Sequence, residues 1–243
     1  MKSVFFVVLP SVFVLLLGCV DSESRETFRF NEAIDNVRVD VSLGQVTVVG
    51  DPSLSDAQVV VTLWCRTVVP EYDVYVAGGA LIVELEAGMD ASGCDGTFEI
   101  RLPAEVDVIA KSKAGDISVS GIEGRVNIVS FDGDVSLLKV AGDINVAVVS
   151  GDFDGTALTG DSGKVTVGAG AVNLTYAGTP STIDVDIIMG HAHLVVPAHV
   201  YYSVDVRTEH GKMDISDDIL IAAAAKNTLK LSVDSGDITL LGI

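Results

Sequence analysis

The residues of this chain that combine regular spacing with possible ligand chemistry are aspartates that follow glycines. Gly115, Gly124, Gly133, Gly142, Gly151 and Gly160 fall nine residues apart, and aspartate follows five of them. Stacked carboxylates could bind Ca²⁺, which takes oxygen ligands; the candidates are Asp116, Asp134, Asp143 and Asp152. The calcium-binding nonapeptide, however, has several glycines and its aspartate in sixth place, whereas here the aspartate is second. We therefore expect these aspartates to form turns, with specific calcium binding as the alternative.

Two histidines suggest a second kind of metal site. His191 and His193 lie two residues apart in GHAHLVV. Residues i and i+2 of a strand share a face, so the two imidazoles could chelate a metal. The sequence places no third ligand, and we favour outward-facing polar positions on an edge strand.

Composition and motifs argue against an enzyme and against nucleic-acid binding. Asp and Glu number 34 against 15 Lys and Arg, for a formal charge of −19, which would repel phosphate backbones. The chain lacks GxSxG, HExxH, CxxC and phosphate-binding glycine loops, and sequence spacing selects no pair of carboxylates for glycoside hydrolysis. We therefore expect no catalysis and no cofactor, with a polysaccharide-active β-helix enzyme as a lesser alternative.

The N-terminus predicts export and lipid anchoring. Val4 to Leu17 is apolar apart from Pro10 and Ser11, too short for a membrane span but suited to a signal peptide. Leu16-Leu17-Gly18-Cys19 resembles a bacterial lipobox. We expect residues 1–18 to be a lipoprotein signal peptide, Cys19 to be lipidated, and residues 19–33 to form a tether; the alternative is a simple secretory signal with a chance cysteine. Val20 stands where an aspartate would resemble an inner-membrane retention signal, which favours the outer membrane.

The other two cysteines, Cys65 and Cys94, lie 29 positions apart. Disulfides persist in exported proteins, so we expect a bridge with Cα atoms about 4.4–6.8 Å apart.

The elements that would position these residues follow from the same repeat. β-branched or leucine residues stand two and four places after the glycine in the first four nonapeptides. Short units of a turn plus an alternating strand predict an all-β, single-stranded β-solenoid over residues 34–243, with two units in each coil. Asp116, Asp134 and Asp152 would then stack on one edge, with Asp143 and Asp161 on another, beside Arg125. Ile219 to Lys226, rich in alanine, predicts a short helical or irregular insertion. The residues expected to point inward are Ile117, Val119, Val126, Ile128, Val135, Leu137, Ile144 and Val146.

A family resemblance rests on three features: a recurring S/A-G-D-I-x-V phrase, the LP-A-x-V-x-V segment at 102–108, and the lipobox. Together they resemble the putative-adhesin β-solenoid family of bacterial envelope proteins, built around a domain of unknown function. The resemblance implies a non-catalytic binding, adhesion or structural role, and brings no ligand or catalytic residues with it. We expect membrane attachment through Cys19 and an envelope protein or glycan as partner, with a calcium- or metal-dependent adhesion module as the alternative.

Overall fold

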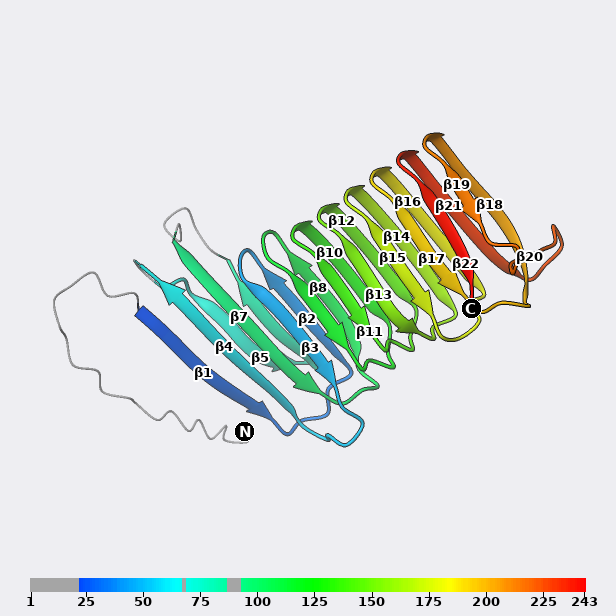
Figure 1. Ribbon diagram of the computed structural model, residues 1–243. Helices are drawn as coiled ribbons and strands as arrows, with labels where there is room; N and C mark the ends of the chain where they lie inside the picture. Colours follow the sequence, from blue (N-terminus) through cyan, green and yellow to red (C-terminus); the bar gives the residue numbers. More distant parts are fainter. Residues whose placement is uncertain (1–21, 67–68, 87–92) are drawn as a thin grey trace.

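The computed structural model describes residues 22–66, 69–86 and 93–243, and all regular structure in these ranges is β-strand. Two eleven-stranded sheets lie face to face and form an elongated stack of coils (Figure 1). Sheet B supplies one strand of each central coil and sheet A supplies the next. The predicted all-β solenoid is confirmed.

Sheet A contains, in spatial order, β1 (Ser22–Phe30), β4 (Ala57–Cys65), β7 (Cys94–Leu102), β3 (Gln45–Gly50), β9 (Ile117–Ser120), β11 (Val135–Leu138), β13 (Phe153–Leu158), β15 (Val172–Tyr176), β17 (Ala192–Val196), β22 (Ile238–Gly242) and β19 (Met213–Ile215). Sheet B contains β20 (Leu220–Ile221), β18 (Tyr201–His210), β21 (Asn227–Ser235), β16 (Thr182–Met189), β14 (Ser162–Ala169), β12 (Ile144–Ser150), β10 (Val126–Asp132), β8 (Asp107–Ser112), β2 (Asn36–Val41), β6 (Ala80–Leu85) and β5 (Tyr72–Ala77). Neighbours are parallel except β1/β4, β4/β7 and β5/β6.

The nonapeptide block sets the length of the central coils. Corresponding residues of β9, β11 and β13 pair 18 positions apart, as Ile117 and Val135 do, so two nonapeptides make one coil as expected. The coils then lengthen: Ala171 stands 19 positions after Asp152, and Ile183 is the partner of Gly163. The repeat visible in the sequence is therefore the most regular part of a longer stack.

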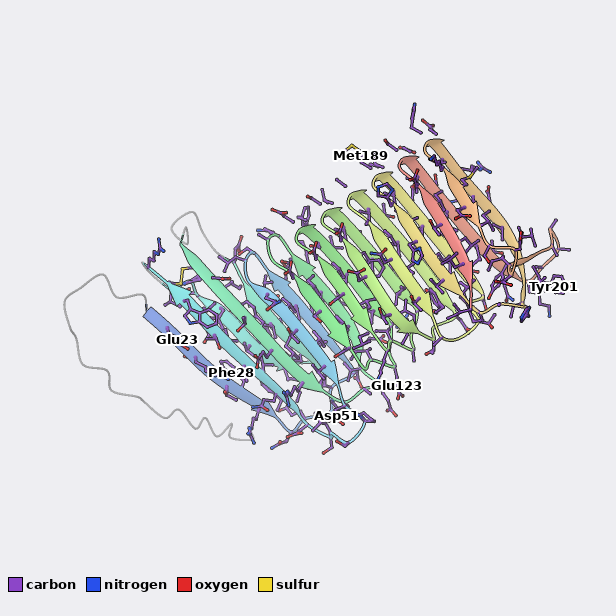
Figure 2. The ribbon with its side chains drawn as sticks, in the orientation of Figure 1. Glu23, Phe28, Asp51, Glu123, Met189 and Tyr201 are labelled. Carbon is purple, nitrogen blue, oxygen red and sulfur yellow. A yellow bond between two sulfur atoms is a disulfide. The ribbon has the colours of Figure 1, made fainter. Side chains whose placement is uncertain are left out.

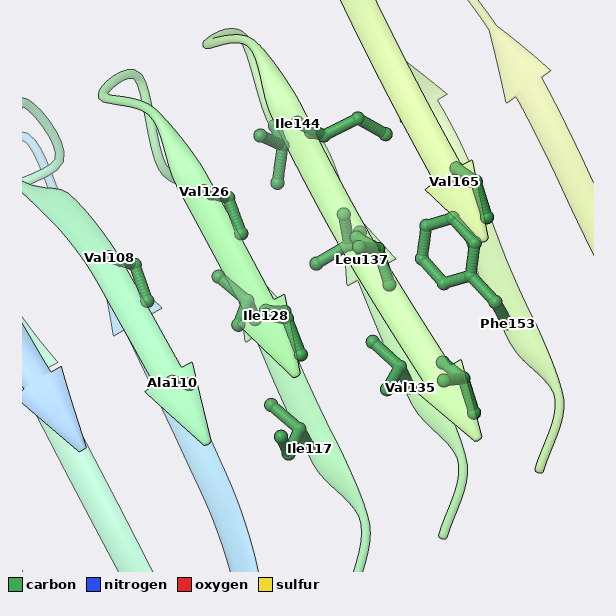
Figure 3. Close-up of a cluster of buried hydrophobic side chains, with 14 of the residues drawn as sticks. Val108, Ala110, Ile117, Val126, Ile128, Val135, Leu137, Ile144, Phe153 and Val165 are labelled. Atoms are coloured by element: carbon green, nitrogen blue, oxygen red, sulfur yellow. The ribbon is translucent and has the colours of Figure 1, made fainter. Parts of the chain in front are cut away.

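The core fills the space between the two sheets. Alternate residues of each strand point inward, because successive side chains of a strand face opposite sides. All eight residues expected inside are at most 4% exposed, and Figure 3 shows Ile117, Ile128 and Leu137 among them. Burial of each such side chain contributes about 1.5–3 kcal/mol, so the core holds each coil to its neighbours.

The order of coils in space departs from the order in sequence at both ends. The coil β21–β22 lies between β16–β17 and the coil β18–β19, although it follows both in the chain. At the other end β2 and β3 pair directly with β8 and β9, while β4 to β7 lie outside them. No helix in the three described ranges is long and apolar enough to cross a membrane.

One segment differs from expectation. Residues 22–30, placed in the tether, form β1 and pair along their whole length with β4, because Phe28 and Phe30 pack against the core.

The expected insertion from Ile219 to Lys226 is present, and of the two forms expected it takes the irregular one: β20 pairs with Tyr201 and Tyr202, and Ile219 is buried. The signal peptide, Cys19 and the first residues of the tether lie outside the described residues.

One edge of the stack is a column of glycines in which backbones approach very closely. A Cβ added to Gly133, whose φ is +137°, would lie 2.5 Å from the carbonyl oxygen of Gly115 in the preceding coil. The same relation repeats through the stack, and the column contains, in order, Gly96, Gly44, Gly115, Gly133, Gly151, Gly170, Gly190, Gly236 and Gly211. At the opposite corners Gly142 and Gly160 have no positive φ, and there close approach alone requires glycine.

Gly133→Ala should lower the free energy of unfolding by about 3 kcal/mol, because the substitution adds a backbone clash to an unfavourable φ. Urea unfolding of the two proteins measures the difference. Gly78→Ala is the control: its φ is +60°, but its added Cβ meets nothing within 4 Å, so about 1 kcal/mol is expected. Equal losses at the two positions would contradict the role of the column.

Candidate functional site

The predicted aspartate column exists, and its hydrogen bonds run between coils. Asp116 Oδ1 accepts the backbone N–H of Asp134 at 2.9 Å, and Asp134 Oδ1 accepts that of Asp152 at 2.8 Å. Asp152 Oδ1 continues the series to the N–H of Ala171. A turn-forming aspartate can bond its own backbone two residues on; here each of these three carboxylates instead bonds the next coil. One oxygen of each carboxylate is thus engaged by the backbone.

The second edge differs from expectation by one residue. Arg125 lies in the column between Asp107 and Asp143, and its guanidinium and backbone N–H both bond the Asp107 carboxylate. The guanidinium of Arg125 lowers the pKa of Asp107. The next position is held by Ser162, whose N–H bonds Asp143 Oδ1. Asp161 falls one place outside this column because the coil here is 19 residues long.

The two histidines do not converge on one site. His191 stands at the glycine-column corner, and its Nδ1 accepts the backbone N–H of Asp237 at 3.0 Å, as an aspartate does elsewhere. His193 lies on the outer face of sheet A beside Asn173 and Thr239. The expectation of an edge strand is wrong, because β22 pairs with β17 on the far side. Within the described ranges no three His, Cys, Asp or Glu side chains are grouped to hold a metal ion.

The disulfide between Cys65 and Cys94 is present and staples β4 to β7. The Cα atoms are 4.1 Å apart, slightly less than expected. Arg66 N–H bonds the Gly93 carbonyl, so Cys65 and Cys94 form the adjacent non-hydrogen-bonded pair, where strands bring Cα atoms closest.

The surface offers broad, open depressions for binding. One at the β1 end of sheet A, about 280 Å³ in volume, sets Arg29 and Arg101 beside Asp51 and Asp56, so its charges balance. A wider one runs along the outer face of sheet B over five strands. It follows a single register row, which we call the sheet B row: Arg38, Ile109, Asn127, Asn145 and Lys164.

The sheet B row presents cations and amides in an otherwise acidic protein. Arg38 and Lys164 are exposed and have no ion pair with any described residue, and they lie four strand spacings, about 19 Å, apart. Between them Asn145 Nδ2 donates to Asn127 Oδ1 at 3.2 Å, and Ile109 is 37% exposed. The row offers hydrogen-bond donors, hydrogen-bond acceptors and positive charge along a line.

Sequence reasoning missed this row for a physical reason. Arg38 and Ile109 are neighbours only because β2 pairs with β8, 71 residues further on. Lys164 joins the row through a coil of 19 residues. The repeat of hydrophobic positions was the available signal, and it identifies which residues point outward but not which strands are adjacent.

Comparison with known proteins adds a family match. The model of the Toastrack family, DUF4097, matches residues 74–241. Similar solved structures include a putative lipid binding protein from Parabacteroides distasonis (12% identity, 89% of this chain and 96% of that one, TM-score 0.46) and a putative adhesin from Parabacteroides merdae (9%, 90% and 95%, 0.44). A putative cell adhesion protein from Clostridium sporogenes is also similar (11%, 92% and 100%, 0.36). Among curated proteins none matches the chain.

Asp134→Asn should change the free energy of unfolding little, because an amide oxygen can still accept the N–H of Asp152, whereas Asp134→Ala should lower it by about 1 kcal/mol. Asp132→Ala is the control, an exposed aspartate whose side chain makes no hydrogen bond to a described residue. Thermal unfolding with and without millimolar calcium tests the alternative. A calcium-dependent rise in melting temperature that Asp134→Asn abolishes would show that the column binds calcium.

Proposed function

The chain belongs to the Toastrack family of DUF4097 domains, and on that premise we propose that it is a non-enzymatic, lipid-anchored binding protein of the bacterial cell envelope. In this proposal the solenoid presents its outer face to an extended ligand, as an adhesion protein does. The lipid at Cys19 holds the protein to the membrane, and the outer membrane is favoured because Val20 follows the cysteine.

The observation that carries the proposal is the sheet B row. Its groups repeat at the strand spacing of about 4.8 Å, and they lie on an open surface rather than in an enclosed cavity. An open row cannot surround a small molecule, whose sites usually bury most of the ligand. A polymer can contact several coils at once, so that the binding free energies of many weak contacts add.

The chemistry of the row selects the class of polymer. Asparagine amides both donate to and accept from hydroxyl groups, and Arg38 and Lys164 supply positive charge at the two ends. A glycan that carries carboxylates at intervals satisfies both features. The total charge of −19 repels polyanions at long range, so we propose a glycan with spaced rather than continuous charge.

The open geometry also fits a role without catalysis. Glycoside hydrolysis needs two carboxyl groups on either side of the bond to be cut. The acidic neighbours of the sheet B row are Asp107 and Asp143 in the row on one side, Asp40 in the row on the other side, and Asp184 next to Lys164. Each carboxylate already has a partner: Arg125 for Asp107, a backbone N–H for Asp143, Lys111 for Asp40 and Lys230 for Asp184. None of the four is thereby placed as a free general acid.

Arg38→Ala combined with Lys164→Ala should weaken binding to an acidic glycan by tenfold or more, because both cations of the row are lost. Binding of the soluble Cys19→Ser protein to a partly carboxylated polysaccharide, and to its neutral counterpart, is measured by calorimetry. Lys212→Ala with Lys226→Ala is the matched control, since it removes two exposed lysines at the far end of the stack, away from the row. Equal affinity of the two double variants would refute the assignment of the row, and a lack of binding by the parent would refute the ligand class.

Cys19→Ser should move the protein from the membrane fraction to the soluble fraction, because lipid is the proposed means of attachment. Fractionation of cells, with mass spectrometry of the N-terminus, checks both location and acylation. Cys65→Ser with Cys94→Ser keeps Cys19 and should remain in the membrane fraction. Retention of the Cys19→Ser protein there would contradict lipid anchoring.

A further inference from the structure

The far end of sheet B leaves a long strand unpaired along one side. β18, Tyr201–His210, is the longest strand in the described residues, and it lies at the end of the stack (Figure 1). On one side it pairs with β21 over nearly its whole length. On the other, β20 pairs only with Tyr201 and Tyr202. Proteins usually protect sheet edges by keeping edge strands short, whereas this edge strand is ten residues long.

The backbone groups of β18 that point outward can be identified. The carbonyl of Tyr202 accepts the N–H of Ala222, on the β20 side. Alternation along a strand then directs the N–H and C=O groups of Val204, Val206 and Thr208 to the same side. No described strand lies there to pair with them. The edge is thus a template for one more strand.

The side chains at this end are also incompletely covered. Val204 and Val206 point toward the core but are only partly buried, unlike their counterparts Leu229 and Leu231 in β21, which are 0% exposed. Tyr201, Met213 and Ile221 are 61%, 54% and 56% exposed, and Tyr201 marks this end in Figure 2. The end of the stack therefore has both unpaired backbone and unburied apolar surface.

We propose that β18 pairs antiparallel with β18 of a second copy of this chain, about a two-fold axis at Val206. The segment left free by β20 and by the corner at Gly211 is Ser203–Glu209, and Val206 is its centre. The outward backbone groups then meet as hydrogen-bonded pairs: Val206 with its own copy, and Val204 with Thr208 in both directions. The same axis brings the corner of one copy, with Met213, alongside β20 of the other.

The charges of β18 are self-complementary in this register. Within one chain Arg207 bonds Asp205 through two nitrogens, at 2.8 and 2.9 Å, on the outer face. The two-fold axis sets Asp205 opposite Arg207 of the second copy, and Arg207 opposite its Asp205. These are non-hydrogen-bonded pairs, in which facing side chains come closest. A second copy of this chain fits the edge better than a strand of arbitrary sequence would.

The pairing makes a closed dimer. A two-fold contact uses the same surface on both copies and ends with two, whereas a head-to-tail contact would continue into filaments. A strand of seven residues gives an interface at the small end of specific contacts, so the dimer should dissociate in the micromolar range.

Sedimentation of the soluble Cys19→Ser protein over a range of concentrations tests the proposal and should show a monomer–dimer equilibrium. Arg207→Asp should weaken the dimer about tenfold, because two attractive cross-strand pairs become repulsive. Combining it with Asp205→Arg should restore the dimer to within about threefold of the parent, since each charge again faces its opposite. Lys111→Asp is the matched control: it reverses one member of an exposed ion pair, with Asp40, on an inner coil, and should leave the dimer unchanged.

Val206→Pro gives an independent test. Its N–H faces outward, so proline removes no hydrogen bond inside the solenoid, and proline is tolerated at such edge positions. The dimer should be lost while thermal unfolding of the monomer changes little. A parent protein that is monomeric at all concentrations, that forms larger assemblies, or whose dimer resists both Arg207→Asp and Val206→Pro would overturn the proposal.

Discussion

Backbone contact at the glycine corners is the constraint from which the rest of the structure follows. Each corner glycine lies so close to the carbonyl of the glycine before it that a side chain cannot fit. Fixing one residue of every coil at the same corner fixes the register of the strands on either side, because the coils are stacked directly. The continuous core and the in-register outer rows are consequences of that alignment. A coil can gain a residue, as those after Gly151 do, only where the extra residue leaves the corner in place.

At most central corners the residue after the glycine supplies an acceptor for the N–H of the next coil, and Ala171, after Gly170, is an exception. Asp116 and Asp134 supply it with a carboxylate, and His191 supplies it with a ring nitrogen. Much of the regular acidity of the sequence is therefore architecture. The outer rows need no such acceptor, since their side chains point to solvent, and the sheet B row can vary in composition while the fold persists. Architecture and recognition thus occupy different positions of the same repeat.

The turns and inward positions of this fold could be predicted from the sequence, but the pairing of strands far apart in the chain could not. The sequence predicts a corner at Gly133 and an inward side chain at Ile117, because turn geometry and burial act within one nonapeptide. The coil that contains Val126 and Val135 was predictable for the same reason. The adjacency of β2 to β8, or of β16 to β21, depends on pairing between segments far apart in the chain, and no local pattern records it. Residues 22–30 were assigned to a tether because their polarity suits solvent, yet an edge strand exposes most of its side chains as well.

The placement of β21–β22 between two earlier coils has a consequence for how the protein folds. Stacks of repeats can in general grow from one end as each unit leaves the ribosome or the export channel, since each unit needs only its predecessor. Here the coil β18–β19 is synthesised before its neighbour. A chain that folds in the order of its synthesis therefore leaves one apolar face of this coil uncovered until residues 227–242 enter between it and β16–β17. In that order the last step is an insertion rather than an addition, and until it is complete the exposed strands favour association between chains.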